Sequence, residues 1–127
     1  MLTGLSIRDV VLIEALDLEF AGGLGVLTGE TGAGKSILLD ALGLALGARA
    51  DSGLVRSGSD KAQVTASFEA SAHVAAFLVD NDIDIDPHEP LIIRRSVKAD
   101  GGSKAFINDQ PCSAALLREL GAALVEI

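Results

Sequence analysis

The stretch Gly29-Glu30-Thr31-Gly32-Ala33-Gly34-Lys35-Ser36 matches the phosphate-binding loop pattern G-x-x-x-x-G-K-[ST] without a mismatch. The apolar run 24–28 before it is typical of a strand, and the run 36–46 after it is typical of a helix. A strand before the loop and a helix after it are the context that this motif requires. The alternative, a glycine-rich turn before a buried helix, is much less favoured once both flanks are counted.

The residue types in this loop suit the binding of a nucleotide's phosphate chain. Gly29 permits a sharp exit from the strand, and Gly32 and Gly34 let the backbone wrap the phosphates without a Cβ clash. The backbone amides then lie at a helix N-terminus, where the helix dipole favours negative charge. Lys35 is expected to reach the β- and γ-phosphates, and the Ser36 hydroxyl is expected to bind Mg²⁺. The expected nucleotide site comprises Gly29, Glu30, Thr31, Gly32, Ala33, Gly34, Lys35 and Ser36.

Binding a nucleotide is not the same as hydrolysing it. Hydrolysis also needs an acidic residue on another strand for the metal and a group that orients the attacking water. Glu126, in the apolar run 123–127, comes closest to the first requirement, but a charged residue on an edge strand is the favoured interpretation. No catalytic residue is therefore assigned, and the catalytic half of the site is expected to lie outside these residues.

The composition predicts one packed domain, because 49% of the 127 residues are hydrophobic and 22% are charged. The net charge of −8 argues against this chain clamping nucleic acid by itself, since such binding depends on Lys and Arg. Aromatic residues are scarce, and four phenylalanines are expected in the core rather than on a base-stacking surface: Phe20, Phe68, Phe77 and Phe106. The single cysteine and the lack of a long apolar run predict a cytoplasmic protein without a membrane span.

The rest of the chain predicts a mixed α/β domain. The first twenty residues alternate as two antiparallel strands, and a buried helix follows the phosphate loop. Further strands are expected at 62–69, 91–97 and 104–107, and 122–127 is expected to begin another. Short helices are expected at 71–80, capped by Ser71, and at 114–120, capped by Ser113.

Stretches well beyond the loop resemble one family. They are 27–42 continuing into 47–51, then 55–58, 93–95, 103–108 and 124–127. On these residues the chain resembles, over its whole length, the N-terminal part of the RecN family of bacterial DNA double-strand-break repair proteins, which are SMC-like, ABC-type ATPases. One departure is Asp109, which follows Asn108 where the family often carries glycine.

The resemblance implies a P-loop NTPase fold. Residues 1–127 would form the N-terminal lobe of an ABC/SMC-type ATPase head, with antiparallel strands packed beside the P-loop strand and helix. The coiled coil and the C-terminal half-head would be absent, so the chain would be a fragment that binds ATP and Mg²⁺ without hydrolysing ATP. ATP would bridge two heads in a head-to-head homodimer, and the full-length protein would handle DNA at the bacterial nucleoid in recombination and repair.

Three arginines remain open. By resemblance Arg49, in the segment that leaves the loop's helix, would approach the nucleotide or DNA, but an arginine favoured by the dipole at a helix C-terminus is equally plausible. Arg94 and Arg95 are adjacent in a strand, so they face opposite ways. A solvated or ion-paired strand is favoured for them over a DNA contact.

Two other functional classes stay open from the sequence. One is a small phosphotransferase or kinase that uses the same loop to place ATP beside an acceptor, but no acceptor-binding residues or arginine-rich lid are visible. The other is a non-catalytic interaction module with a vestigial loop. Nucleotide titration of the fragment separates these possibilities, because absence of ATP binding would support the interaction module and binding with phosphotransfer would support the phosphotransferase.

Overall fold

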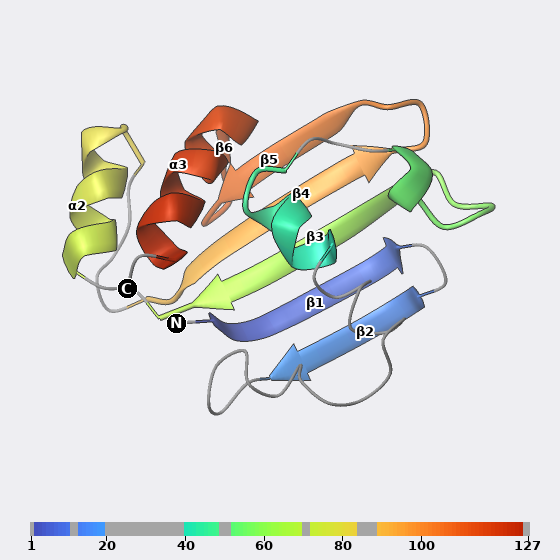
Figure 1. Cartoon of the computed structure of the whole chain (residues 1–127), viewed down its shortest axis with the longest axis horizontal. Helices are drawn as coiled ribbons and strands as arrows, with labels where there is room; N and C mark the ends of the chain where they lie inside the picture. The colour runs from blue at the N-terminus through green and yellow to red at the C-terminus, as the bar shows by residue number, and fades with distance from the viewer. Residues whose placement is uncertain are drawn as a thin grey trace.

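The computed structural model of the chain describes residues 2–10, 13–19, 40–48, 52–69, 72–83 and 89–125. Its main element is a six-stranded antiparallel sheet in the order β2-β1-β3-β4-β5-β6 (Figure 1). The strands are β1 (Leu2–Val10), β2 (Ile13–Glu19), β3 (Lys61–Phe68), β4 (Leu91–Lys98), β5 (Ser103–Ile107) and β6 (Gln110–Cys112). The helices are the short η2 (Ser52–Leu54), α2 (Ala72–Asp80) and α3 (Ala114–Val125), and residues 40–45 are also helical.

One face of the sheet forms the core. Side chains of a strand alternate between its two faces, and in β3 and β4 every second residue is buried. The buried face carries Leu5, Ile7, Ala62, Val64, Ala66, Phe68, Leu91, Ile93, Arg95, Val97, Ala105 and Ile107. The opposite, open face carries mostly polar side chains, which are partly or fully exposed.

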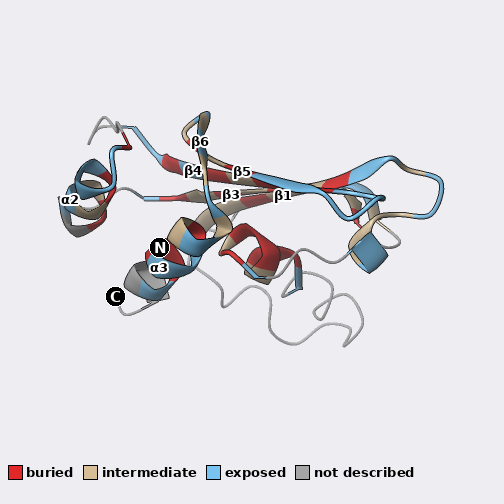
Figure 2. Cartoon of the chain, turned by 90° about the horizontal axis from the view of Figure 1, so that it is seen from above, coloured by how far each residue is buried: buried red, intermediate tan, exposed pale blue. Residues whose placement is uncertain are grey.

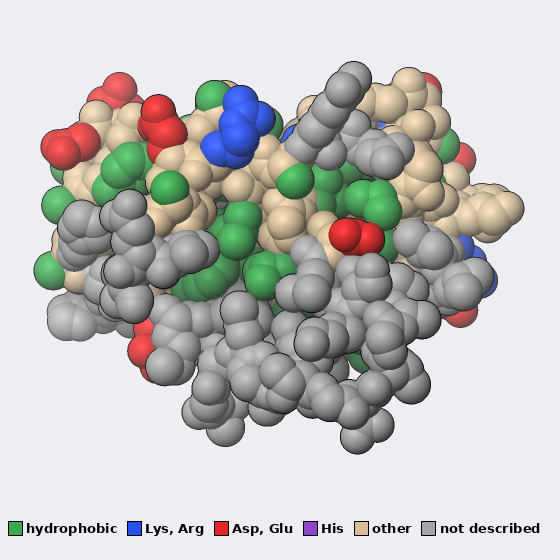
Figure 3. Space-filling model, in the orientation of Figure 1, with side chains coloured by type: hydrophobic (Ala, Val, Ile, Leu, Met, Phe, Trp, Pro, Cys, Tyr) green, Lys and Arg blue, Asp and Glu red, His purple; other side chains and the backbone are tan. Residues whose placement is uncertain are grey.

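Helices cover the buried face. Figure 2 shows α3 on one side of the sheet, with the buried positions of the strands above it. The helical segment 40–45 lies on the same side, and it buries Ala41, Leu42, Leu44 and Ala45 while Asp40 is exposed. α3 contributes the buried Leu117 and Leu120. α2 packs beside α3, and hydrophobic side chains are visible on this helical face among charged ones (Figure 3).

Most of the predicted elements are confirmed. The two N-terminal strands, the strands near 62–69, 91–97 and 104–107, and the helix near 71–80 occur within about a residue or two of their expected bounds. Ser113 caps α3, because its Oγ accepts a hydrogen bond from the Leu116 N–H at 3.1 Å. The strand predicted at 24–28, the cap Ser71 and Phe20 lie outside the described residues.

Two predictions about the C-terminal part need correction. The strand expected from residue 122 is wrong, because α3 continues as a helix to Val125. Gly121 is tolerated inside this helix since its bare backbone lies against Leu46. The short strand β6 was not anticipated, although a two-residue turn, Asn108 and Asp109, joins it to β5 with positive φ angles of 47° and 67°.

Phe106 also differs from expectation. It is paired with Arg94 across β4 and β5 on the open face of the sheet and is only partly buried, so it is not a core residue. Phe68 is buried as expected. None of the described helices is long and apolar enough to cross a membrane.

Candidate functional site

The structure describes the C-terminal end, residues 43–48, of the helix that the sequence predicts after the phosphate loop. The Ala48 N–H donates to the Gly43 carbonyl at 2.9 Å, and the Gly47 N–H donates to the Leu44 carbonyl at 3.2 Å. These two bonds, with a φ of 97° at Gly47, make a Schellman motif. Glycine is favoured at this position because it adopts positive φ without strain from a side chain.

Arg95 closes this helix end from the sheet. It is 2% exposed, and one terminal nitrogen donates to the carbonyls of Leu44 and Ala48, each at 3.1 Å. Its other terminal nitrogen lies 3.4 Å from the Ser103 Oγ on β5. The last carbonyls of a helix carry partial negative charge and have few partners within the helix, so a buried guanidinium supplies both a hydrogen bond and a compensating positive charge.

α3 closes the helix end from the other direction. An Arg118 terminal nitrogen donates to the Gly47 carbonyl at 3.3 Å. A Cβ at Gly47 would lie 2.6 Å from the Arg118 backbone nitrogen and 2.8 Å from the Ala114 carbonyl oxygen. A Cβ at Gly121 would lie 3.2 Å from the Leu46 Cβ. α3 can pack this closely on the helix end only because both positions are glycine.

The electrostatics of this site are unusual for a core. Burial, followed by the nearby Arg118 cation, lowers the pKa of Arg95 from its ordinary value. Burial also raises the pKa of the neighbouring Cys112 thiol, and Arg95 acts in the opposite direction. In the part of the chain that the structure describes, the ion pairs involve Arg8, Arg56 and Arg94, so Arg95 has no carboxylate partner there.

The open face of the sheet carries Arg94. Its guanidinium lies over the Phe106 ring, 4.6 Å from the ring centroid, and 3.5 Å from an Asp109 carboxylate oxygen. Arg94 and Arg95 therefore face opposite ways, as predicted. The interpretation as a solvated or ion-paired strand is confirmed for Arg94, whose side chain is 37% exposed, and is wrong for the buried Arg95.

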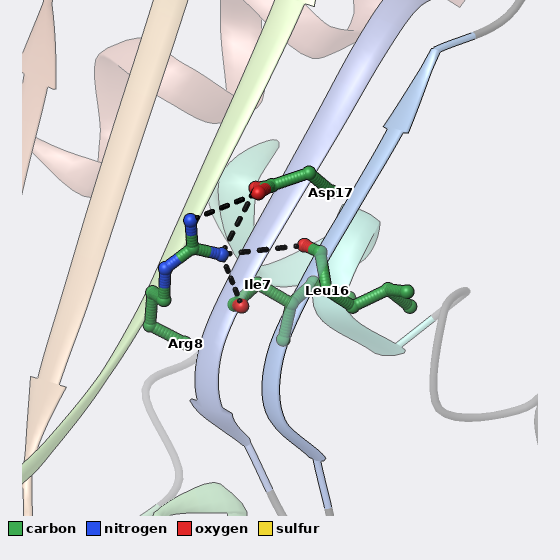
Figure 4. Close-up of polar contacts among 4 residues, drawn as sticks. All are labelled: Ile7, Arg8, Leu16 and Asp17. Carbon is green, nitrogen blue, oxygen red and sulfur yellow. Dashed lines mark hydrogen bonds and ion pairs between the residues drawn. The ribbon is translucent and has the colours of Figure 1, made fainter.

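A second ion pair lies on the β1–β2 hairpin (Figure 4). One terminal nitrogen of Arg8 lies 2.9 Å from an Asp17 carboxylate oxygen and also donates to the carbonyls of Ile7 and Leu16, at 2.9 and 3.4 Å. The hydrogen bond from Arg8 is the main cause that lowers the pKa of Asp17 below its usual value. Both side chains of this pair are exposed, at 46% and 64%.

The residues of the expected nucleotide site, Gly29 through Ser36, lie outside the described residues, and so do Arg49 and Glu126. The assignment of that site therefore stays a prediction. Sequence reasoning singled out Arg95 but missed its burial, although a signal was present. Arg95 has the same spacing in its strand as Leu91, Ile93 and Val97, which together define the buried face.

The arrangement of sheet and helices is similar to that of solved structures of SMC proteins. The chain superposes on a solved structure titled "Structural biochemistry of ATP-driven dimerization and DNA stimulated activation of SMC ATPases" with a TM-score of 0.72. The superposition covers 98% of this chain and 79% of the other, at 23% sequence identity. At this identity the likeness establishes the fold alone, and it confirms the predicted P-loop NTPase class with its antiparallel sheet.

The sequence defines the family. Residues 5–112 match the AAA domain family, and the chain belongs to it. The chain is 45% identical over 131 residues to the DNA repair protein RecN of Haemophilus influenzae and 42% identical over 127 residues to RecN of Xylella fastidiosa. Each match takes in 100% of this chain and 23% of the relative, so the chain spans under a quarter of the relatives' length. The resemblance to the N-terminal part of RecN is confirmed.

Proposed function

We propose that the chain is the ATP-binding N-terminal lobe, residues 1–127, of a RecN-like ATPase that acts in DNA double-strand-break repair and recombination. The observation that carries this proposal is the 45% identity to a RecN protein along the whole chain, together with an unbroken phosphate-loop pattern. The donor set of that loop, with three glycines, a lysine and a hydroxyl, fits a magnesium-bound triphosphate.

The proposed roles follow the chemistry of each side chain. The loop amides and Lys35 bind the phosphates, and Ser36 holds Mg²⁺ through its hydroxyl. Arg49 is a proposed contact to the nucleotide or to DNA. In the longer protein, ATP joins two heads as a homodimer, and head engagement gates the handling of DNA in the bacterial cytoplasm at the nucleoid.

Titration of the purified chain with ATP and Mg²⁺ tests the proposal. Wild-type chain binds ATP, and Lys35→Ala loses binding because it removes the cation that contacts the β- and γ-phosphates. Lys104→Ala, which removes an exposed lysine on β5, is the matched control and binds as the wild type does. Absence of binding by the wild-type chain would refute the assignment.

The proposal also predicts no turnover by the chain alone, because no acidic residue for the metal and no group to orient water has been assigned within it. Release of inorganic phosphate is measured with the same preparations. Sustained release by wild-type chain, but not by Lys35→Ala, would show that these residues already hold a complete catalytic site.

A further inference from the structure

Arg95 places a buried charge at the end of one helix. Within the described residues it has no carboxylate partner, and its Nε–H has no hydrogen-bond acceptor. Burying a charge without a partner of opposite charge costs free energy, so an arginine at this position is not the choice expected from stability alone. What the guanidinium does provide is a fixed position for the carbonyls of Leu44 and Ala48.

The same helix end is held by other elements as well. Arg118 of α3 donates to the Gly47 carbonyl, and the Gly47 backbone lies against that of Arg118 with no room for a Cβ. The Leu46 side chain lies against Gly121. A helix that slid or rotated would lose both Arg95 bonds and would drive Gly47 into α3. Its position relative to the sheet is therefore set at residues 43–48.

We propose that Arg95 is a positioning residue for nucleotide binding. By holding residues 43–48 at the C-terminal end of this helix, it sets the position, relative to the sheet, of the helix that the sequence predicts to begin at the phosphate loop. This inference rests on the proposed function. The helix that the sequence predicts from the loop to this end has about ten residues and would span about 15 Å, so a shift at its C-terminal end would be carried to the loop. A displacement of about 1 Å at a binding loop is enough to cost a large factor in affinity or rate.

Three variants, made in the full-length protein, test the proposal. Arg95→Met removes both hydrogen bonds to the helix end, and Arg95→Lys keeps a cation that can donate to the same carbonyls. Val97→Ala is the matched control, because Val97 is buried on the same face of β4 but bonds to no helix carbonyl. Affinity for ATP with Mg²⁺ is measured by calorimetry at a temperature where urea titration shows every variant fully folded.

The expected result is a loss of about tenfold or more in ATP affinity for Arg95→Met, partial recovery in Arg95→Lys, and no loss in Val97→Ala. A purely structural Arg95 predicts a different result, in which affinity is the same for Arg95→Met and Val97→Ala. That outcome, with wild type binding ATP, would overturn the positioning role and leave the proposed function intact.

A second measurement needs no nucleotide. The amides of Leu46, Gly47 and Ala48 bond back to the carbonyls of the last helical turn, so their hydrogen exchange reports on this end. Exchange at these amides is expected to rise in Arg95→Met and not in Val97→Ala. Equal exchange in the two variants would refute the positioning role of Arg95, whether or not the wild-type protein binds ATP. Absence of ATP binding by the wild-type protein would refute the proposed function and leave this measurement valid.

If Arg95→Met does not fold, Arg118→Met takes its place. Arg118 is exposed and donates to the Gly47 carbonyl of the same helix end, so its removal is tolerated more easily. A fall in ATP affinity smaller than that expected for Arg95→Met supports the coupling between the helix end and the nucleotide. Wild-type affinity in Arg118→Met, with Arg95→Lys also unchanged, overturns it.

Discussion

The backbone of Gly47 lies against Arg118 so closely that an added Cβ would sit 2.6 Å from the Arg118 nitrogen. Gly47 also has a φ of 97°, which side chains other than glycine rarely adopt. Gly47→Ala is therefore expected to destabilise the chain for two reasons: it strains the backbone, and its Cβ forces α3 away. We expect a loss of about 3 kcal/mol or more in the free energy of unfolding, measured by urea denaturation.

Gly58→Ala is the matched control for this prediction. Gly58 has a similar φ of 88°, but nothing lies within 4 Å of its Cβ position. The substitution there adds backbone strain alone and is expected to cost about 1 kcal/mol. Equal losses for the two variants would mean that the close approach of α3 contributes nothing to stability.

The two arginines of β4 illustrate how far sequence reasoning reaches. The period of two along a strand correctly put Arg94 and Arg95 on opposite faces. It also places Arg95 in line with Leu91, Ile93 and Val97, so its burial could have been inferred. The sequence could not show which groups accept the hydrogen bonds of the Arg95 guanidinium. The carbonyls that Arg95 meets belong to residues 51 and 47 positions earlier, and only the folded chain brings them together.

The same reasoning explains the outcome at the C-terminus. The sequence predicts that 122–127 begins a strand, and glycine ordinarily ends a helix. In the structure Gly121 lies inside α3, where it lets that helix approach Leu46. Local propensity and a tertiary contact predict opposite roles for one glycine, and the contact prevails.

The Arg8–Asp17 pair predicts a pH dependence. The hydrogen bond from Arg8, supported by one from Ser6 and by the charge of Arg8, holds the pKa of Asp17 below its usual value. A carboxylate with a lowered pKa stabilises the folded state above the unfolded pKa of about 3.9, and this contribution is lost as pH falls through the folded pKa. Carbon NMR titration of Asp17 should therefore show a lowered midpoint.

Arg8→Met should return that midpoint toward about 3.9, because it removes the main donor and its charge. Arg94→Met is the control, since Arg94 lies on β4, with β3 and β1 between it and the strand of Asp17. The pair is exposed, so added salt should shrink the difference between wild type and Arg8→Met. A midpoint that is the same in wild type and in Arg8→Met would refute the assignment.

Asn108 contributes to the turn between β5 and β6 in two ways, through a side-chain hydrogen bond and through a positive φ angle, and two substitutions separate these contributions. Its Oδ1 accepts a hydrogen bond from the Ile92 N–H at 2.7 Å, and its φ is 47°. Asn108→Gly keeps the turn free of strain but loses the side-chain bond, which is expected to cost about 1 kcal/mol. Asn108→Ala loses the bond and adds strain, so about 2 kcal/mol is expected. Urea denaturation should therefore give the highest free energy of unfolding for wild type, a lower one for Asn108→Gly and the lowest for Asn108→Ala. If Asn108→Gly is as stable as wild type, the side-chain hydrogen bond contributes nothing and the whole effect belongs to the backbone.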